Sequence, residues 1–183
     1  MDLIVKKKKS NAKEEFSIGN HISYSLKGLY RIEHIETLSL MGSLDKYYVL
    51  SHAYNKTIHK TFAPVKNARE LGMRPLTTIK TFDELKKIVQ ELELIPEEIT
   101  NNSNKKMKSY EMRIKERGFT EMIHAFFCVY HDIKISKRED KRYIQFLERL
   151  KILICEEMSL TTGENLDTCK EYFESMTKKY QSQ

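Results

Sequence analysis

Apolar and polar positions alternate with a period of two from Phe16 onward, through the N-terminal third of the chain. Runs rich in β-branched and aromatic residues are separated by turn material that contains glycine or asparagine. Four such runs cover residues 21–25, 29–37, 46–51 and 56–65, and a helical turn and a last extended segment follow within residues 64–76. Short strands at this spacing predict a small, strongly bent antiparallel sheet or barrel.

The period changes at Thr81 to that of an amphipathic helix. Thr81 and Glu84 match the capping-box pattern, and apolar residues follow at helical spacing as far as Leu92. Pro96 is expected to stop this helix, and the polar residues 97–106 have the composition of a linker.

Four further apolar stripes at helical spacing predict a C-terminal bundle; one ends at Gly118, and the next runs from Met122 to Ile133. Two more capping boxes pair Ser136 with Glu139 and Thr161 with Glu164. We therefore expect an α+β protein, with an N-terminal small antiparallel β-barrel and a C-terminal all-α helical bundle. The expected units are a mobile basic tail (residues 1–14), a β domain (15–80) and a helical domain (81–183).

The composition fits a folded protein of the cytoplasm. With 40% hydrophobic and 32% charged residues, the chain has too much apolar content to be disordered throughout. No apolar run approaches the roughly 20 residues that span a bilayer, and the first residues do not match a signal peptide. The three cysteines are far apart, which indicates reduced thiols rather than a disulfide framework or a zinc knuckle.

The positive charge is concentrated in one helical block. The net charge is +6, and residues 104–151 contain 13 Lys or Arg against seven Asp or Glu. Such a block predicts a polyanionic partner, although a solvated helix surface would have the same composition. Lys137, Arg138, Lys141 and Arg142 crowd the start of a predicted helix, where cations oppose the helix dipole at a cost of a few tenths of a kcal/mol each. This placement favours a functional basic face.

Catalytic and metal-binding patterns are weak. His124, Cys128 and His131 lie on one face of a predicted helix, but a cysteine at the edge of the core with flanking histidines in solvent is the favoured interpretation over a zinc site. No nucleophile motif, phosphate loop or converging carboxylate pair is present. The tyrosines of the predicted strands fit core packing better than a stacking platform for nucleotides. We expect no enzymatic activity, no metal and no cofactor.

Several short motifs occur in the same order as in a known family. They are "FSIGNHISYSLKGLYRIEHIE", Gly-Met-Arg at 72–74, "RGFTEMIHAFFCVYHDI" and "ISKRED". Over about residues 15–177 the chain resembles the CarD/CdnL family of bacterial transcription regulators. The resemblance implies a Tudor-like β domain that docks on the RNA polymerase β subunit. It also implies a helical domain that contacts promoter DNA at the upstream edge of the transcription bubble and affects open-complex formation or stability.

The resemblance also implies candidate DNA contacts in the basic helices. Family members carry a Trp wedge before the first basic helix, whereas this chain has no Trp and Asn104 stands at the matching position. An Asn can hydrogen-bond a base or sugar edge but cannot act as an apolar wedge. The expected DNA-binding residues are Asn104, Lys105, Lys106, Lys108, Arg113, Lys137, Arg138, Lys141 and Arg142.

The polymerase contact implied by the resemblance is expected to be more apolar here. Leu38, between Thr37 and Ser39, and Phe62 occupy positions where other members can offer basic side chains. Docking would then use these residues, Lys60 and an exposed strand edge, because strand addition needs few particular side chains. We expect a monomer with double-stranded promoter DNA and polymerase as partners. A protein–protein adaptor without DNA contact and a free-standing nucleoid-type DNA-binding protein remain alternatives.

Overall fold

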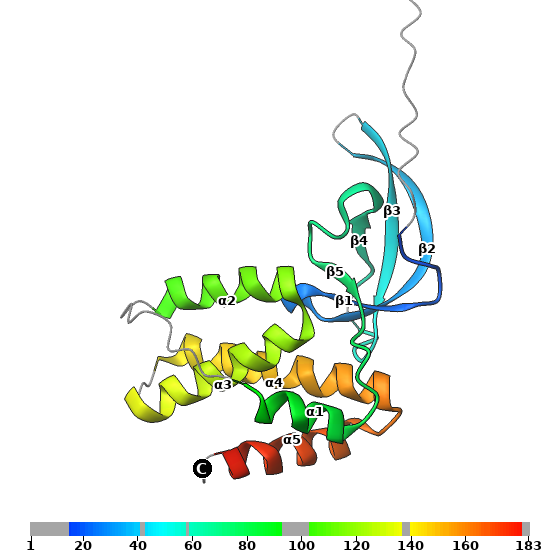
Figure 1. The fold of residues 1–183 in the computed structure, drawn as a ribbon. Helices are drawn as coiled ribbons and strands as arrows, with labels where there is room; N and C mark the ends of the chain where they lie inside the picture. The colour runs from blue at the N-terminus through cyan, green and yellow to red at the C-terminus, as the bar shows by residue number, and fades with distance from the viewer. Residues whose placement is uncertain (1–14, 41–42, 58, 93–102, 137–139, 181–183) are drawn as a thin grey trace, which may run out of the picture.

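The computed structural model describes residues 15–40, 43–57, 59–92, 103–136 and 140–180. An antiparallel sheet comes first in the chain, and the helices follow it and form a separate layer below the sheet in Figure 1. The expected basic tail at residues 1–14 lies outside the described residues, as do Pro96 and the first part of the expected linker. Residues 103–106 of that linker are helical, so the linker prediction was wrong there.

The sheet contains five strands in the order β4-β3-β2-β1-β5, and every neighbouring pair is antiparallel. The strands are β1 (His21–Tyr24), β2 (Leu29–Leu40), β3 (Ser43–His52), β4 (Thr61–Pro64) and β5 (Met73–Pro75). The sheet is not closed into a barrel, because β4 and β5 form its two edges and do not pair with each other. The predicted barrel was therefore wrong, although the alternative of a bent antiparallel sheet was correct.

The strand predicted over residues 56–65 is shorter in the structure, because a turn formed by the Asn55 side chain precedes it. Asn55 Oδ1 accepts hydrogen bonds from the Thr57 backbone N at 3.0 Å and from Thr57 Oγ1 at 2.6 Å. An Asx turn of this kind satisfies backbone donors locally and competes with strand pairing. As a result β4 begins only at Thr61.

One face of the sheet carries the β core. Tyr48 pairs with Ile35 on β2, and the Tyr48 ring packs edge-on against Phe16 with 5.9 Å between the ring centroids. The Tyr48 hydroxyl also accepts a hydrogen bond from the Phe16 backbone N at 3.2 Å. The buried residues of this core include Tyr24 and Tyr30, which confirms core packing for these strand tyrosines.

The helices are α1 (Phe82–Gln90), α2 (Ser103–Arg117), α3 (Phe119–Ser136), α4 (Lys141–Thr162) and α5 (Leu166–Tyr180). The Thr81–Glu84 capping box is present at α1, with both reciprocal hydrogen bonds. The other two predicted boxes were wrong: Asp140 caps α4, and the Asn165 side chain accepts from the Thr168 backbone N at the start of α5.

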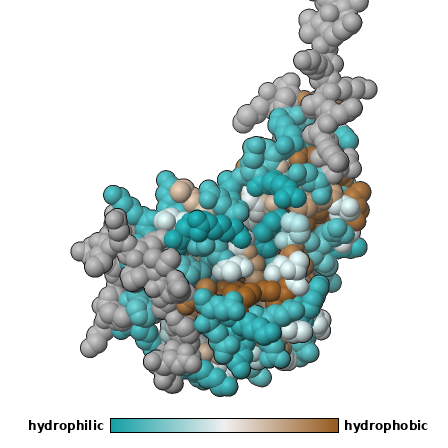
Figure 2. All heavy atoms as spheres, viewed as in Figure 1, coloured by the Kyte–Doolittle hydropathy of each residue, from teal (hydrophilic) through white to brown (hydrophobic). Residues whose placement is uncertain are grey.

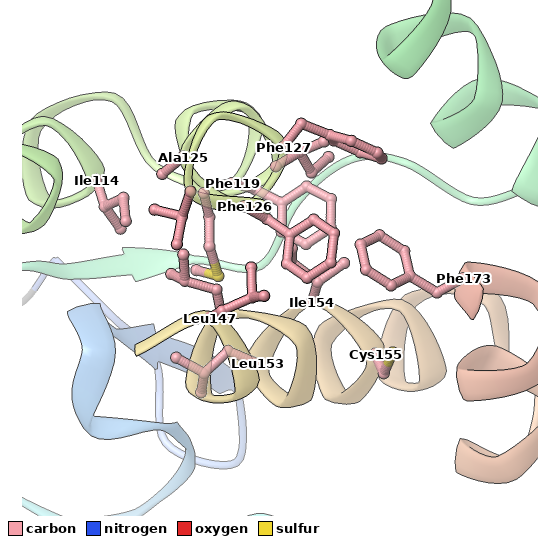
Figure 3. Close-up of a cluster of buried hydrophobic side chains, with 14 of the residues drawn as sticks. Ile114, Phe119, Ala125, Phe126, Phe127, Leu147, Leu153, Ile154, Cys155 and Phe173 are labelled. Atoms are coloured by element: carbon pink, nitrogen blue, oxygen red, sulfur yellow. The ribbon is translucent and has the colours of Figure 1, made fainter. Parts of the chain in front are cut away.

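The helical core is centred on α3 and α4. Figure 3 shows Phe126 and Phe127 of α3 and Ile154 of α4 packed toward Phe173 of α5. The Phe126 and Phe173 ring centroids are 4.8 Å apart in an edge-on arrangement. Helix α2 lies on one side of this pair and α1 with α5 on the other (Figure 1). The sheet and the helices therefore have separate apolar cores.

Polar contacts join these two cores. Arg149 of α4 donates through Nη2 to the backbone oxygens of Leu26 at 3.0 Å and of Lys27 at 2.7 Å. The Tyr54 hydroxyl donates to the Glu156 backbone oxygen at 2.8 Å. The Leu26 side chain packs against the helical core, so apolar contact accompanies the hydrogen bonds.

Candidate functional site

The ends of three helices meet at one end of the helical layer, at the left of Figure 1. Asp132, near the end of α3, accepts a hydrogen bond from Lys106 Nζ of α2 at 2.7 Å and from the Tyr143 hydroxyl of α4 at 2.9 Å. One carboxylate therefore holds the first turns of α2 and α4 beside each other.

A second contact reinforces this convergence. Asp140, the N-cap of α4, accepts from the Arg142 backbone N at 3.0 Å. A hydrogen bond from the Ser103 side chain, at the start of α2, is the main cause of the lowered pKa of the Asp140 carboxyl, and the backbone hydrogen bonds from Arg142 and Tyr143 add to it. The carboxylate stays ionised where it caps α4, so the two helix starts are tied together at neutral pH.

Five of the sequence-predicted DNA-binding residues gather on this end, and all five are exposed. We call this surface the cationic end; it consists of Asn104, Lys105, Lys108, Lys141 and Arg142. Its positive potential has two sources, because the N-termini of α2 and α4 add their dipoles to the side-chain charges. The sequence clusters around Lys105 and Lys141, 36 residues apart in the chain, thus lie at the starts of two adjacent helices.

Two other predicted DNA-binding residues are engaged inside the bundle. Lys106 is only 11% exposed at its side chain and is paired with Asp132. Arg113 Nε lies 2.9 Å from Glu121 Oε1, and its guanidinium lies over the Tyr110 ring at 4.9 Å. Both cations are offset by carboxylates of α3, and these ion pairs connect α2 to α3. Lys137 and Arg138 lie outside the described residues.

Sequence reasoning missed one exposed cation near this end. Lys134, in the last turn of α3, is exposed and lies 5.7 Å from the centroid of the Tyr130 ring. Its position within the basic block was visible, but a single lysine at a helix C-terminus is also the usual partner of the helix dipole. Only the meeting of α3 with α2 and α4 places it beside the cationic end.

The residues predicted to contact polymerase divide between the two faces of the sheet. Phe62 pairs with Val49 and Leu38 with Asp45, and the alternation along β2 and β3 puts both on the face opposite the β core. Phe62 is 44% exposed and Leu38 is half-buried. Thr37 and Ser39 are exposed on the other face of the same hairpin. Lys60 is exposed directly before the edge strand β4.

The cysteines are buried and free of disulfides. Cys128 Sγ lies 3.6 Å from His124 Nε2, and His131 is exposed. Within the part of the chain that the structure describes, no group of three or more His, Cys, Asp or Glu residues is arranged to hold a metal ion. Burial raises the pKa of the Cys155 thiol to about 12, and the nearby Cys169 adds to this effect. A thiol with this pKa is a poor nucleophile at neutral pH.

No protein-family model matches this sequence, and no curated protein matches it significantly. Among the described helices, none has an apolar stretch long enough to cross a bilayer.

Proposed function

We propose that this chain is a non-enzymatic regulator of bacterial transcription of the CarD/CdnL type, with a Tudor-like β domain. In this proposal the sheet docks on the RNA polymerase β subunit. The cationic end contacts promoter DNA near the upstream edge of the bubble and alters the formation or lifetime of the open complex. The observation that carries the proposal is that two clusters of exposed basic residues lie at the adjacent starts of α2 and α4.

The cationic end is suited to phosphates rather than to base edges. Lys105, Lys108 and Lys141 are flexible point charges, and the helix N-termini beside them favour anions. Contacts of this kind position a protein on DNA without reading its sequence. We therefore expect weak binding to free duplex, with promoter selectivity supplied by the polymerase.

Asn104 is the one polar, uncharged member of the cationic end. It is exposed in the first turn of α2, beside the positive dipole of that helix. Its amide offers both a donor and an acceptor to a base or sugar edge, but no apolar surface that could separate stacked bases. The proposed effect on the open complex is therefore electrostatic and does not depend on wedging.

The sheet offers a different type of surface. Phe62 and Leu38 supply apolar area on its outer face, and Lys60 adds a positive charge at the start of β4. An apolar centre with a charged rim is the usual anatomy of a protein–protein interface. The edge strand β4 also provides backbone for strand addition.

A promoter assay tests this proposal. The lifetime of open complexes is measured with purified RNA polymerase in the presence of the wild-type chain and of a Lys108→Gln, Lys141→Gln, Arg142→Gln variant. We expect the wild type to change the lifetime and the variant to lose most of that effect while it still binds polymerase. A variant that retains the full effect would instead identify a protein–protein adaptor without DNA contact.

A further inference from the structure

A cleft of about 730 Å³ lies where the end of α2 meets the segment between β4 and β5. Figure 1 shows α2 running from the cationic end toward this part of the sheet, and Figure 2 shows mostly hydrophilic side chains over α2. Four cations and two acids line the cleft, together with two methionines and a glycine. They are Arg69, Glu70, Met73, Arg74, Met112, Lys115, Glu116, Arg117 and Gly118.

Three of the four cations can accept an anion from outside. The fourth, Arg74, forms a two-pronged ion pair with the buried Glu157, so it is not available to an external anion. Within the described part of the chain, Arg117 makes a long contact of 3.5 Å with Glu121, whose other oxygen already lies 2.9 Å from Arg113. A guanidinium has five N–H donors, more than this distant carboxylate oxygen can accept.

Packing positions Lys115, and an ion pair that an external anion can replace positions Arg69. Lys115 is exposed, and its stem lies so close to Gly72 that an added Cβ there would come within 3.2 Å of Lys115 Cγ. Arg69 pairs with Glu15 at 3.0 Å, but both side chains are well exposed, so a phosphate can replace the carboxylate at low cost. Both cations line the cleft and are exposed to solvent.

One exposed stripe of α2 connects the cationic end to the cleft. Lys105, Lys108, Met112 and Lys115 follow one another at spacings of three, four and three residues, and all are exposed. This spacing keeps them on one face of the helix. At 1.5 Å per residue the stripe is about 15 Å long, which is enough to follow several phosphates of one DNA strand.

We propose that this cleft is a second phosphate-binding site, into which the DNA backbone held at the cationic end continues. Arg69, Lys115 and Arg117 bind the phosphates, and Met112 contacts the apolar side of a deoxyribose between them. This inference rests on the proposed function, and it extends the DNA contact from the free end of the helices to their junction with the sheet. Continuity with a stripe of like charge favours a phosphate backbone over an acidic segment of a partner protein.

Binding of the full-length protein to a labelled 25-base-pair duplex, measured by fluorescence anisotropy over a series of salt concentrations, tests the inference. The cleft variant is Arg69→Gln, Lys115→Gln, Arg117→Gln. The cationic-end variant is Lys108→Gln, Lys141→Gln, Arg142→Gln. A matched control with the same loss of charge is Lys86→Gln, Lys87→Gln, Lys179→Gln, because these exposed lysines lie on α1 and α5.

We expect the cleft variant to bind at least tenfold more weakly at low salt. The slope of log K against log salt should become shallower by about 2 to 3, since each phosphate contact contributes about 0.9. The control should keep a steeper slope than the cleft variant. A charge-conserving variant, Arg69→Lys, Lys115→Arg, Arg117→Lys, should retain the wild-type slope, which separates lost charge from lost packing.

Three results would overturn the inference, and they differ in what they say of the proposed function. If only the cationic-end variant has a shallower slope, the cleft does not bind DNA and the proposed function stands. If neither variant differs from the control, both proposals fail. If the cleft variant keeps the wild-type slope but no longer binds RNA polymerase, the cleft binds an acidic segment of the partner protein.

Discussion

The Arg74 guanidinium and the Glu157 carboxylate form a two-pronged ion pair between the sheet and the helices, with N–O distances of 2.6 and 2.7 Å. Glu157 is fully buried, and its Oε1 also accepts from the Thr77 backbone N at 2.7 Å. A bidentate pair with a third donor has little freedom to rotate. The direction of α4 relative to β5 is thereby fixed, and with it the separation between the cationic end and the outer face of the sheet.

Breaking this ion pair should destabilise the protein strongly. Arg74→Ala leaves the Glu157 carboxylate buried without its cation, a change that typically costs about 3–5 kcal/mol. Urea unfolding followed by circular dichroism measures the loss. As a control, Lys170→Ala removes an exposed pair with Asp167 and should cost less than about 1 kcal/mol. A loss of similar size in both variants would show that the Arg74–Glu157 pair does not hold the two parts together.

Gly118 should be more sensitive to substitution than Gly163, although both have nearly the same backbone conformation. Their φ angles are +79° and +81°, so alanine at either position costs about 1–2 kcal/mol of backbone strain. A Cβ at Gly118 would also lie 3.0 Å from Arg74 Cδ, whereas at Gly163 the space is open. Gly118→Ala should therefore lower the free energy of unfolding by more than Gly163→Ala. Equal losses from urea unfolding would contradict the close approach of α2 and α3 to Arg74.

Glu156 should make the protein less stable at neutral pH than under mildly acidic conditions. Burial raises the pKa of its carboxyl, and its Oε2 has no hydrogen-bond partner among the described residues. The neutral acid is therefore favoured in the folded state. Its contribution to stability is full below the usual pKa near 4.5 and is lost as the pH rises through the folded-state pKa.

Replacing the Glu156 carboxylate by a neutral amide removes the destabilisation that its charge causes at neutral pH. Glu156→Gln should raise the melting temperature at pH 7, by about 2–4 °C for each kcal/mol gained. The difference from the wild type should shrink toward pH 4, which differential scanning calorimetry at the two pH values would show. A wild type that melts higher than the variant at pH 7 would mean that the charged carboxylate makes a stabilising contact.

The local parts of the fold follow from the sequence, whereas the contacts that build the site do not. Thr81 and Glu84 cap α1 as the pattern predicts, because a capping box needs only four consecutive residues. The same pattern at Ser136 fails, since α3 continues through Ser136 and Asp140 takes the cap. A four-residue shift of the cap, from Ser136 to Asp140, has no signature in a periodicity of 3.6 residues.

Long-range pairing explains the remaining differences. An alternating pattern identifies strands but does not say whether the two edges of their sheet meet, so the barrel was predicted where the sheet is open. Lys106 and Arg113 belong to the basic block in the sequence, yet carboxylates from α3 engage them. Partners 26 residues apart, or 83 for Arg74 and Glu157, leave no mark in a single sequence.

Co-elution with bacterial core RNA polymerase tests the central claim most directly. The full-length chain is passed over a size-exclusion column with polymerase, beside a Phe62→Glu variant and a Leu166→Glu control in which a partly buried side chain of the helical layer is changed. We predict that the wild type and the control elute with polymerase and that Phe62→Glu does not, because a charge would replace the apolar centre of the docking face. A wild-type chain that elutes apart from polymerase, yet still binds naked duplex DNA, would contradict the account and indicate a nucleoid-type DNA-binding protein.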